Sequence, residues 1–434
     1  MAKKKKIGED EELLYNGDFP SLNSMLQKTS PELFKRNAVS LGFPTGFYPL
    51  DYRNGYLTTV YDDDDNIIKE YDNVGIFGGT FNTIIGKTGT AKTTLAAQMA
   101  VSISNYCLMK YKIPAEIYHI DAEQASNYTR IKNITGSSVS HLKKIYHINQ
   151  ELIYIEDIYE AIESIVKIKE KYKDTFIVDT DLLSEFDEPI RIFIPTIIII
   201  DSLPSIANKE VGDDTGLMTS TYSNRLAKSI SRFYKQCMPI VKKYNLIIFV
   251  INHINTKIEI NPMRHTSPQT MYLKMDEALP GGMAPLYYAH NIFKIVVEEK
   301  LILENGGIVD GFNARVELLK SRSNKAGKSC NLIYDQSRGF DPYLSIYNYL
   351  KTECDDVILG KNPKKYIAGF EDAKFDEREL RDVLDQRKDI KEALINIAIK
   401  KLRNILSKNK FNEFSPSISD VQLIYENLRE SENL

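Results

Sequence analysis

The sequence predicts an α/β protein with a mostly parallel central sheet flanked by helices. From Thr80 to about Tyr349, apolar runs of β type alternate with patterns of helical spacing. One of these runs, Thr196–Ile200, is isoleucine after its first residue. Such uninterrupted branched runs are typical of strands that are buried on both faces, as in parallel sheets. A glycine loop also joins one β-type run directly to a helical pattern, which is typical of the same fold class.

The periodicity of each segment predicts its structure, in chain order. We expect strands at residues 81–85, 116–120, 192–200, 246–251, 292–297 and 315–319. We expect helices at residues 92–111, 157–172 and 222–244. Tyr56 to Tyr71 should form a hairpin with Asp62 to Asp65 at its tip. These aspartates lack the glycine and the downstream glutamate of a calcium-binding loop, so we interpret the tip as a solvated turn.

The length of the chain predicts more than one unit. At 434 residues, it exceeds the size of a single compact core. We expect a leader at residues 1–40, which could contact another subunit, and a core at residues 41–350. A polar stretch then separates the core from a small helical domain at residues 351–434, where apolar residues return at helical spacing.

Composition restricts the function classes. The net charge of −3 gives no global basic surface for nucleic acid, so any such surface must be local. The four cysteines lie far apart and show no zinc-ligand spacing, which predicts reduced thiols and a cytoplasmic location. The longest apolar run is too short to span a bilayer, and the basic N-terminus lacks the apolar region of a secretory signal. We therefore expect no membrane partner.

The most informative local motif is a glycine loop that ends in Lys-Thr-Thr, between a β-type run and a helical pattern. Glycines leave space for backbone N–H groups to face a triphosphate, and the helix N-terminus adds positive charge. In such a loop Lys92 would reach the β- and γ-phosphates of ATP, and Thr93 would bind Mg²⁺. Ala91 stands where the usual motif has glycine. The predicted nucleotide-binding residues are Gly86, Lys87, Thr88, Gly89, Thr90, Ala91, Lys92, Thr93 and Thr94.

Two carboxylates complete this predicted ATPase site. Asp201 ends the isoleucine run, in the position of an acid that holds Mg²⁺ through water at the carboxyl edge of the sheet. Glu123 follows the β-type run after the glycine-loop helix, where a carboxylate can deprotonate the attacking water. Strands often end in acids without function, so each assignment depends on the other and on the glycine loop.

These motifs, in this order, resemble the core of the RecA-type homologous recombinases. The order is DAE, IIIIDS, FVINH, a long loop closed by two glycines, and VELLKSR. The lead-in LGFPTGFYPLD at residues 41–51 is also similar, and the resemblance covers roughly residues 41–350. It is closest to the phage UvsX-type branch, which has histidine where bacterial proteins carry glutamine at position 253. The resemblance implies a RecA-like P-loop ATPase core.

The resemblance assigns roles to residues outside the glycine loop. Asn252 and His253 would face the γ-phosphate, although a histidine at a strand end can simply bond the backbone. Lys320 and Arg322 would reach into the ATP site of a neighbouring subunit and stabilise the transferring phosphoryl group. Alternation on one strand would put both on the same face, where they could instead be solubility charges. Tyr128 could stack on the adenine.

The resemblance also implies two DNA-binding loops. One, from Ile254 to Pro280, ends at a glycine pair, and the other spans Asn208 to Leu217. On the helix after the shorter loop, Arg225 and Arg232 are two turns apart and so share a face, which could also be a solvated basic face. The predicted DNA-binding residues are Arg225, Arg232, Lys257, Arg264, Lys274, Gly281 and Gly282.

The preferred interpretation is an ATP-dependent recombinase that forms a helical homo-oligomeric filament on single-stranded DNA. It would pair that strand with duplex DNA and exchange strands, with single-strand-binding and loader proteins as further partners. The expected setting is the cytoplasm of a bacterial or phage-infected cell. Two alternatives stay open, because the fold alone does not decide among them. One is a hexameric replicative-type helicase, and the other is a regulatory paralogue that binds ATP without exchanging strands.

Overall fold

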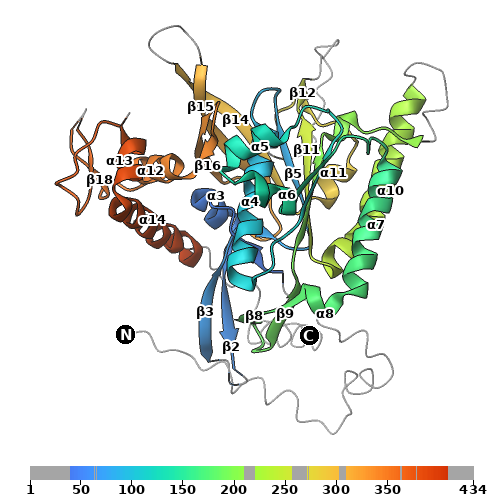
Figure 1. Ribbon diagram of the computed structural model, residues 1–434, viewed down its shortest axis with the longest axis horizontal. Helices are drawn as coiled ribbons and strands as arrows, with labels where there is room; N and C mark the ends of the chain where they lie inside the picture. Colours follow the sequence, from blue (N-terminus) through green and yellow to red (C-terminus); the bar gives the residue numbers. More distant parts are fainter. Residues whose placement is uncertain are drawn as a thin grey trace, which may run out of the picture. The chain divides into compact units, whose positions relative to one another are not determined.

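A nine-stranded sheet forms the centre of the protein (Figure 1). The computed structural model describes residues 40–62, 64, 66–209, 220–256, 271, 273–302, 309–361, 364–377 and 379–408. The strand order is β17-β16-β15-β14-β5-β11-β10-β6-β7. The strands are β5 (Thr80–Gly86), β6 (Ile117–Asp121), β7 (Tyr146–Asn149), β10 (Thr196–Asp201), β11 (Leu246–His253), β14 (Asn291–Ile302), β15 (Val309–Lys320), β16 (Ser329–Asp335) and β17 (Gly339–Asp341).

The two halves of this sheet differ in direction. Strands β14, β5, β11, β10, β6 and β7 run parallel to one another. From β14 outward, β15, β16 and β17 pair antiparallel. The α/β fold with a mostly parallel sheet is therefore confirmed. The isoleucine run occupies β10, between two parallel neighbours, and every residue of that strand is buried.

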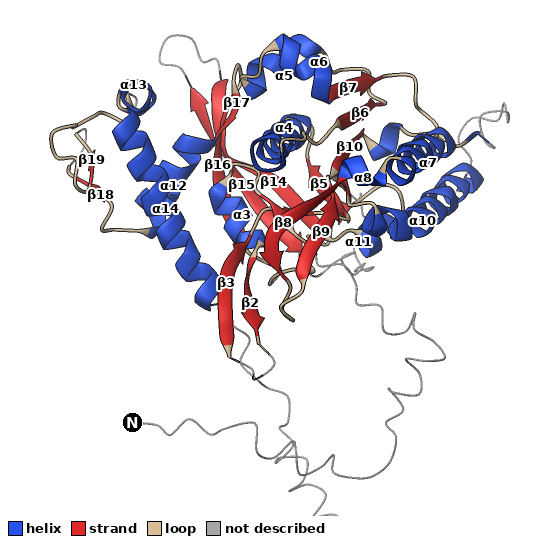
Figure 2. Ribbon diagram, turned by 60° about the horizontal axis from the view of Figure 1, so that its bottom comes forward, coloured by secondary structure: helices blue, strands red, loops and turns tan. Residues whose placement is uncertain are grey.

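Helices cover both faces of the parallel half (Figure 2). On one face, α7 (Ile155–Lys171) and α10 (Ser220–Lys243) share an apolar cluster with β5, β6, β10 and β11. This cluster contains Ile198 and Ile200 of β10. Helix α4 (Lys92–Tyr111) contacts the same strands but contributes no side chain to that cluster. By alternation, the intervening residues Ile197 and Ile199 face α4. The predicted helices agree with these three within two residues.

The predicted strand at residues 192–200 is wrong in one respect. It consists of two strands, because β9 (Pro189–Phe193) ends before β10 begins at Thr196. Pro195 lies between them, and proline has no N–H group for a strand ladder. β9 pairs with β8 (Ile177–Leu183) in a separate hairpin.

A second hairpin joins β2 (Tyr56–Tyr61) to β3 (Ile67–Asn73), so the hairpin predicted at residues 56–71 is confirmed. Of its tip, Asp62 and Asp64 are among the described residues. The remaining short elements are β1 (Gly42–Phe43), α3 (Tyr48–Asn54), β4 (Ile76–Phe77), α5 (Tyr128–Thr135), α6 (Val139–Ile145), α8 (Lys173–Phe176), η3 (Leu203–Ser205), β12 (Asn255–Thr256), β13 (Glu277–Ala278) and α11 (Ala284–Tyr288).

The C-terminal helices pack against one edge of this core. They are α12 (Pro342–Glu353), α13 (Leu380–Gln386) and α14 (Lys388–Lys408), with the short pair β18 (Ile358–Leu359) and β19 (Tyr366–Ile367). Their apolar side chains form one cluster that also includes Tyr52 of α3. Because α12 begins before residue 351 and shares this cluster, the predicted boundary falls within a helix. The division into domains stays a prediction.

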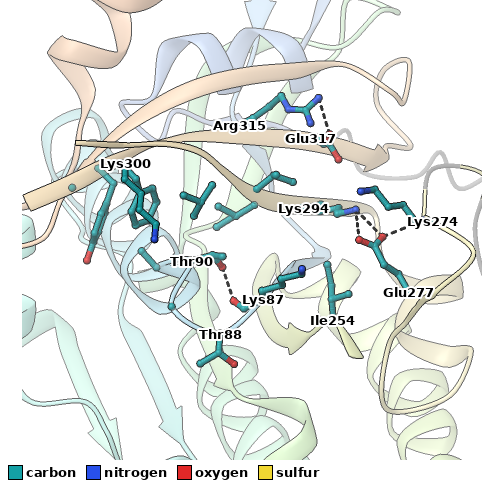
Figure 3. Close-up of a pocket in the computed structure, with 18 of the residues that line it drawn as sticks. Lys87, Thr88, Thr90, Ile254, Lys274, Glu277, Lys294, Lys300, Arg315 and Glu317 are labelled. Atoms are coloured by element: carbon teal, nitrogen blue, oxygen red, sulfur yellow. Dashed lines mark hydrogen bonds and ion pairs between the residues drawn. The ribbon is translucent and has the colours of Figure 1, made fainter. Parts of the chain in front are cut away.

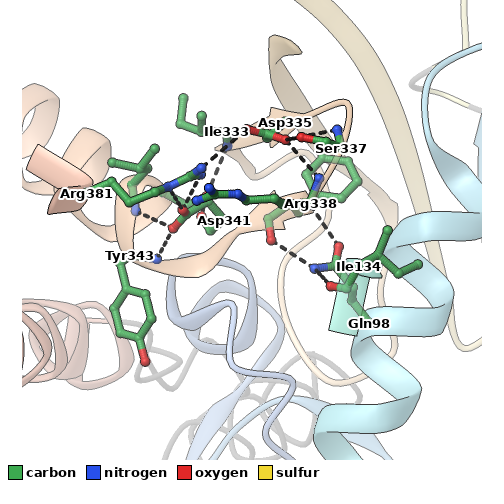
Figure 4. Close-up of polar contacts among 12 residues, drawn as sticks. Gln98, Ile134, Ile333, Asp335, Ser337, Arg338, Asp341, Tyr343 and Arg381 are labelled. Atoms are coloured by element: carbon green, nitrogen blue, oxygen red, sulfur yellow. Dashed lines mark hydrogen bonds and ion pairs between the residues drawn. The ribbon is translucent and has the colours of Figure 1, made fainter. Parts of the chain in front are cut away.

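Polar contacts connect these helices and α4 to the same sheet edge (Figure 4). Arg381 of α13 donates to Asp341 through Nε at 3.1 Å and NH2 at 2.6 Å. Its NH1 also donates to Asp335 of β16 at 3.3 Å. From α4, the buried Gln98 side chain both accepts from Phe340 N and donates to Phe340 O, at 2.8 and 2.9 Å. The edge strand β17 is thus held from two sides.

Within the described ranges, no helix combines the length and the apolar character that crossing a membrane requires.

Candidate nucleotide-binding and catalytic site

The glycine loop has the predicted strand–loop–helix geometry. β5 ends at Gly86, and α4 begins at Lys92. A Cβ atom at Gly86 would lie 2.6 Å from Thr90 Oγ1 and 2.9 Å from Ile295 O, so this position accepts glycine only. Ala91 caps α4 in the left-handed conformation, with φ of 59°. For alanine this conformation costs about 1–2 kcal/mol, which explains why the usual motif has glycine there.

Lys92 is buried inside the loop that precedes it. Its Nζ donates to Lys87 O at 2.9 Å and to Gly86 O at 3.2 Å. Burial lowers the pKa of Lys92, and the nearby carboxylates of Asp201 and Glu123 oppose that shift. The ammonium therefore lies among loop carbonyls, within electrostatic reach of both predicted acids.

Thr93 and Asp201 meet directly. The Thr93 hydroxyl, in the first turn of α4, donates to Asp201 Oδ2 at 2.6 Å. Asp201 is the last residue of β10 and is 3% exposed. A hydroxyl and a carboxylate are the hard oxygen donors that Mg²⁺ prefers, so these residues fit the predicted ion.

Glu123 and His253 come together from neighbouring parts of the sheet edge. His253 ends β11, and its Nε2 lies 3.1 Å from Glu123 Oε1. The Ser202 hydroxyl donates to the same oxygen. Partial burial raises the pKa of Glu123, but the hydrogen bonds from Ser202 and His253 outweigh it and leave the pKa below its ordinary value. The carboxylate is therefore ionised at neutral pH and can accept a proton from water.

A cavity of about 940 Å³ opens beside the loop (Figure 3). Residues Lys87 to Ala91 line one side, and strands β14 and β15 line the other. The sequence did not single out its far wall. Phe312 and Tyr334 stack there with ring centroids 4.5 Å apart, and Arg130 donates to the Tyr334 hydroxyl at 3.1 Å. These residues come from antiparallel strands and from α5, so no local motif marks them.

The charges of this cavity favour an anion. Its lining contains more cations than acids, and a buried ion pair joins Lys294 Nζ to Glu277 Oε2 at 2.7 Å. Lys274, predicted to bind DNA, lines the cavity and donates its backbone N–H to Glu277 at 3.1 Å. The cationic residues are Lys87, Lys274, Lys294, Lys300 and Arg315, and the acidic residues are Asp276, Glu277 and Glu317.

Lys320 and Arg322 converge on α11, although they do not share a strand. β15 ends at Lys320, so the predicted strand alternation does not extend to Arg322. Lys320 Nζ donates to Leu286 O at 2.7 Å and to Tyr287 O at 2.8 Å. Arg322 donates to Tyr287 O at 3.0 Å. Burial, and then the neighbouring Arg322, lower the pKa of Lys320 to about 8. Neither residue lines the cavity beside the glycine loop.

Tyr128 begins α5 and is 41% exposed. Its hydroxyl donates to Tyr146 O at 3.0 Å, and the residue is not part of the cavity lining. Its role in binding adenine stays a prediction.

The described DNA-binding candidates lie in two places. Arg225 and Arg232 line one cavity of about 440 Å³ beside α7, together with Glu156 and Glu160, so they share a face as predicted. Strands β12 and β13 pair the ends of the long loop, and Gly281 and Gly282 follow β13 with φ of 89° and 75°. Lys257, Arg264 and most of the shorter loop lie outside the described residues. The DNA-binding assignments stay predictions.

The comparisons with known proteins give little further information. No protein-family model matches this chain, and no curated protein matches it. Among solved structures, the chain is similar to the crystal structure of the RadB recombinase, with a TM-score of 0.36 and 15% sequence identity. The match covers 62% of this chain and 92% of that chain. A likeness of this size carries no functional argument, so function must be argued from the site itself.

Proposed function

We propose that this protein is an ATP-dependent homologous recombinase that forms a helical filament on single-stranded DNA and exchanges strands with homologous duplex. One observation supports the proposal above the others. Lys92 and Thr93 of α4, Asp201 of β10 and the Glu123–His253 pair gather at the carboxyl edge of adjacent parallel strands. Ligands of open α/β sheets bind at this edge.

The gathered side chains suit ATP hydrolysis with Mg²⁺. Thr93 and Asp201 would hold the ion, which neutralises charge on the phosphate oxygens. Lys92 would exchange its loop carbonyls for phosphate oxygens. Glu123, ionised at neutral pH, would accept a proton from the attacking water. The stacked aromatic wall of the cavity is suited to an adenine base.

The contact between His253 and Glu123 suggests how nucleotide and DNA could be coupled. His253 precedes the loop predicted to bind DNA. Its ring lies 3.1 Å from the carboxylate of Glu123, the predicted general base. A γ-phosphate oxygen that attracted the imidazole would break this contact and shift the first residues of the loop. ATP and DNA would then favour the same state of the chain, which is linkage between two sites.

Electron microscopy with single-stranded DNA, with and without a non-hydrolysable ATP analogue, tests the proposal. We expect helical filaments that depend on the analogue. A second experiment measures strand pairing. In it, a labelled single strand should form a joint molecule with homologous supercoiled duplex DNA. Closed rings with unwinding of forked duplex would favour a hexameric helicase. ATP binding with neither assembly nor joint molecules would favour a regulatory paralogue. The phage-type assignment stays a prediction, since it depends on His253.

A further inference from the structure

A buried group of polar side chains on the α4 side of the sheet includes Asp201, one of the predicted magnesium ligands. It consists of His119 and Asp121 of β6 and Asp201 of β10. His119 and Asp121 are two residues apart on a strand and so share a face. Asp201 pairs directly with Asp121 in the parallel register. One ligand atom from each residue lies within 4.8 Å of the other two, and all three residues are buried.

Two atoms in this group lack hydrogen-bond partners. Within the described part of the chain, neither His119 Nε2 nor Asp121 Oδ1 makes a hydrogen bond, although both atoms are buried. His119 Nε2 lies 3.6 Å from Asp201 Oδ2, which is too long for a hydrogen bond. An unpartnered buried polar atom costs about 1–3 kcal/mol, so two of them within one group of buried side chains require an explanation.

The other polar atoms of the same side chains are held firmly. His119 Nδ1 lies 3.0 Å from the Tyr146 hydroxyl. Asp121 Oδ2 accepts from Ser126 N and from the Gln150 side chain, each at 2.8 Å. Neighbouring groups orient protein metal ligands in this way. His119 Nε2 and Asp121 Oδ1 stay available, whereas Asp201 Oδ2 already accepts from the Thr93 hydroxyl at 2.6 Å. In the tautomer in which Nδ1–H donates to the Tyr146 oxygen, the lone pair is on Nε2, which lies 3.6 Å from Asp201 Oδ2.

We propose that His119, Asp121 and Asp201 bind a divalent transition-metal ion, with Asp201 shared between this ion and the magnesium expected at Thr93. A tetrahedral ion with ligands at about 2.1 Å has ligand atoms about 3.4 Å apart. The observed 3.6 Å between His119 Nε2 and Asp201 Oδ2 is close to that spacing. Imidazole nitrogen with two carboxylates selects transition ions such as Mn²⁺ or Zn²⁺ over Mg²⁺, which prefers oxygen.

The charge at this place also favours a bound cation. Asp121 and Asp201 are 0% and 3% exposed, and buried carboxylates need compensation. Lys92 is electrostatically coupled to Asp201, but burial disfavours its own charge. The exposed Gln150 side chain, which also donates to Ser126 O at 3.1 Å, lies between the group and solvent.

The test is Mn²⁺ binding to the full chain without nucleotide or DNA, so its result is independent of the proposed function. Electron paramagnetic resonance counts the bound ions, and its pulsed form detects coupling to an imidazole nitrogen. We expect one tightly bound Mn²⁺ per chain, with nitrogen coupling in the wild type. Binding without this coupling, or no binding, would overturn the proposal, because only an oxygen site or an ordered water would then be present.

Three variants, each checked for its fold by circular dichroism, identify the ligands. His119→Phe should abolish the nitrogen coupling and weaken binding about a hundredfold. Asp121→Asn, which keeps an acceptor for Ser126, should weaken binding but retain the coupling. His147→Phe is the matched control, because it removes an imidazole from the adjacent strand β7, where His147 pairs with Tyr118. Coupling that survives His119→Phe, or loss of binding in the control, would reject the assigned ligands.

Discussion

At the residue scale, the chemistry of the site depends on which polar atoms meet. Glu123 stays ionised because Ser202 and His253 contact its carboxylate and outweigh its partial burial. Asp201 accepts a hydrogen bond from the Thr93 hydroxyl, and its charge acts on Lys92. Ala91 has the left-handed backbone that the motif normally gives to glycine.

Lys92→Ala and Glu123→Gln should separate nucleotide binding from turnover. Lys92→Ala removes the ammonium group that would contact the phosphates. It should weaken ATP binding and reduce turnover at least about a hundredfold. Glu123→Gln keeps an acceptor for Ser202 but cannot take the proton, so ATP should bind normally while turnover falls about 10²- to 10⁴-fold. Nucleotide affinity and phosphate release, measured separately, check both. Normal turnover in Lys92→Ala would reject the loop as the nucleotide site.

Ala91→Gly should stabilise the protein. Glycine avoids the cost of the left-handed conformation, which stabilises the folded chain by about 1–2 kcal/mol. The greater freedom of glycine in the unfolded chain offsets about 0.4–1 kcal/mol of this gain. The free energy of unfolding should therefore rise by about 0.5–1 kcal/mol in denaturant titration. The control is Ala227→Gly, inside α10, which should lose about 1 kcal/mol. Equal losses in both variants would show that Ala91 is not strained.

At the element scale, single polar side chains hold helices to the sheet. Gln98 joins α4 to β17, and Arg381 joins α13 to the same edge. Lys169 of α7 is almost fully buried, and its Nζ donates to Ile194 O at 2.6 Å and to Tyr244 O at 2.9 Å. Ile194 precedes β10, and Tyr244 follows α10. The Lys169 ammonium of α7 therefore connects three elements.

The burial of Lys169 should make stability depend on pH. Burial lowers the pKa of Lys169 from its ordinary 10.5 to about 7. Between these values the unfolded chain binds more protons than the folded chain, so this residue makes stability rise with pH, by up to about 1.4 kcal/mol per pH unit. Below about pH 7 its contribution is constant.

Denaturant titrations from pH 7 to 9 check this prediction. In Lys169→Met the rise with pH should be smaller than in the wild type, whereas in the exposed control Lys167→Met it should be unchanged. The same rise in both variants would contradict the prediction.

At the scale of the whole molecule, Lys320 and Arg322 bear on whether the proposed ATPase site would need a second chain. Lys320 and Arg322 bond the carbonyls at the end of α11 and do not line the cavity beside the glycine loop of their own chain. An assembly in which these cations approached a neighbouring cavity would make hydrolysis depend on filament formation.

Arg322→Ala should therefore abolish DNA-stimulated hydrolysis and leave ATP binding to the isolated chain nearly intact. Mixing it with Lys92→Ala protein should restore part of the activity, because some interfaces then combine an intact loop with an intact arginine. Lys325→Ala, a nearby exposed cation, is the control and should behave as wild type. No restored activity at any ratio, with mixed filaments visible by microscopy, would place the complete site within one chain.

The sequence by itself determined the α/β class, the helices α4, α7 and α10, the β2–β3 hairpin and the glycine loop. Each depends on local spacing: branched apolar runs, helical periodicity, or a fixed order of glycines and Lys-Thr. The sequence also predicted that Asp201 and Glu123 lie at the edge where parallel strands end together, because Asp201 ends one buried strand and Glu123 follows another. The break at Pro195 was missed, since the apolar pattern continues across it.

Only the tertiary structure decided which distant side chains meet. Phe312 and Tyr334 face the glycine loop because β15 and β16 extend the sheet beyond β14. His119 and Asp121 reach Asp201 because β6 pairs with β10 across about 80 residues of sequence. Spacing along the chain carries no information on such pairings. They are fixed by strand order and register, which depend on the burial of the whole sheet between its helices.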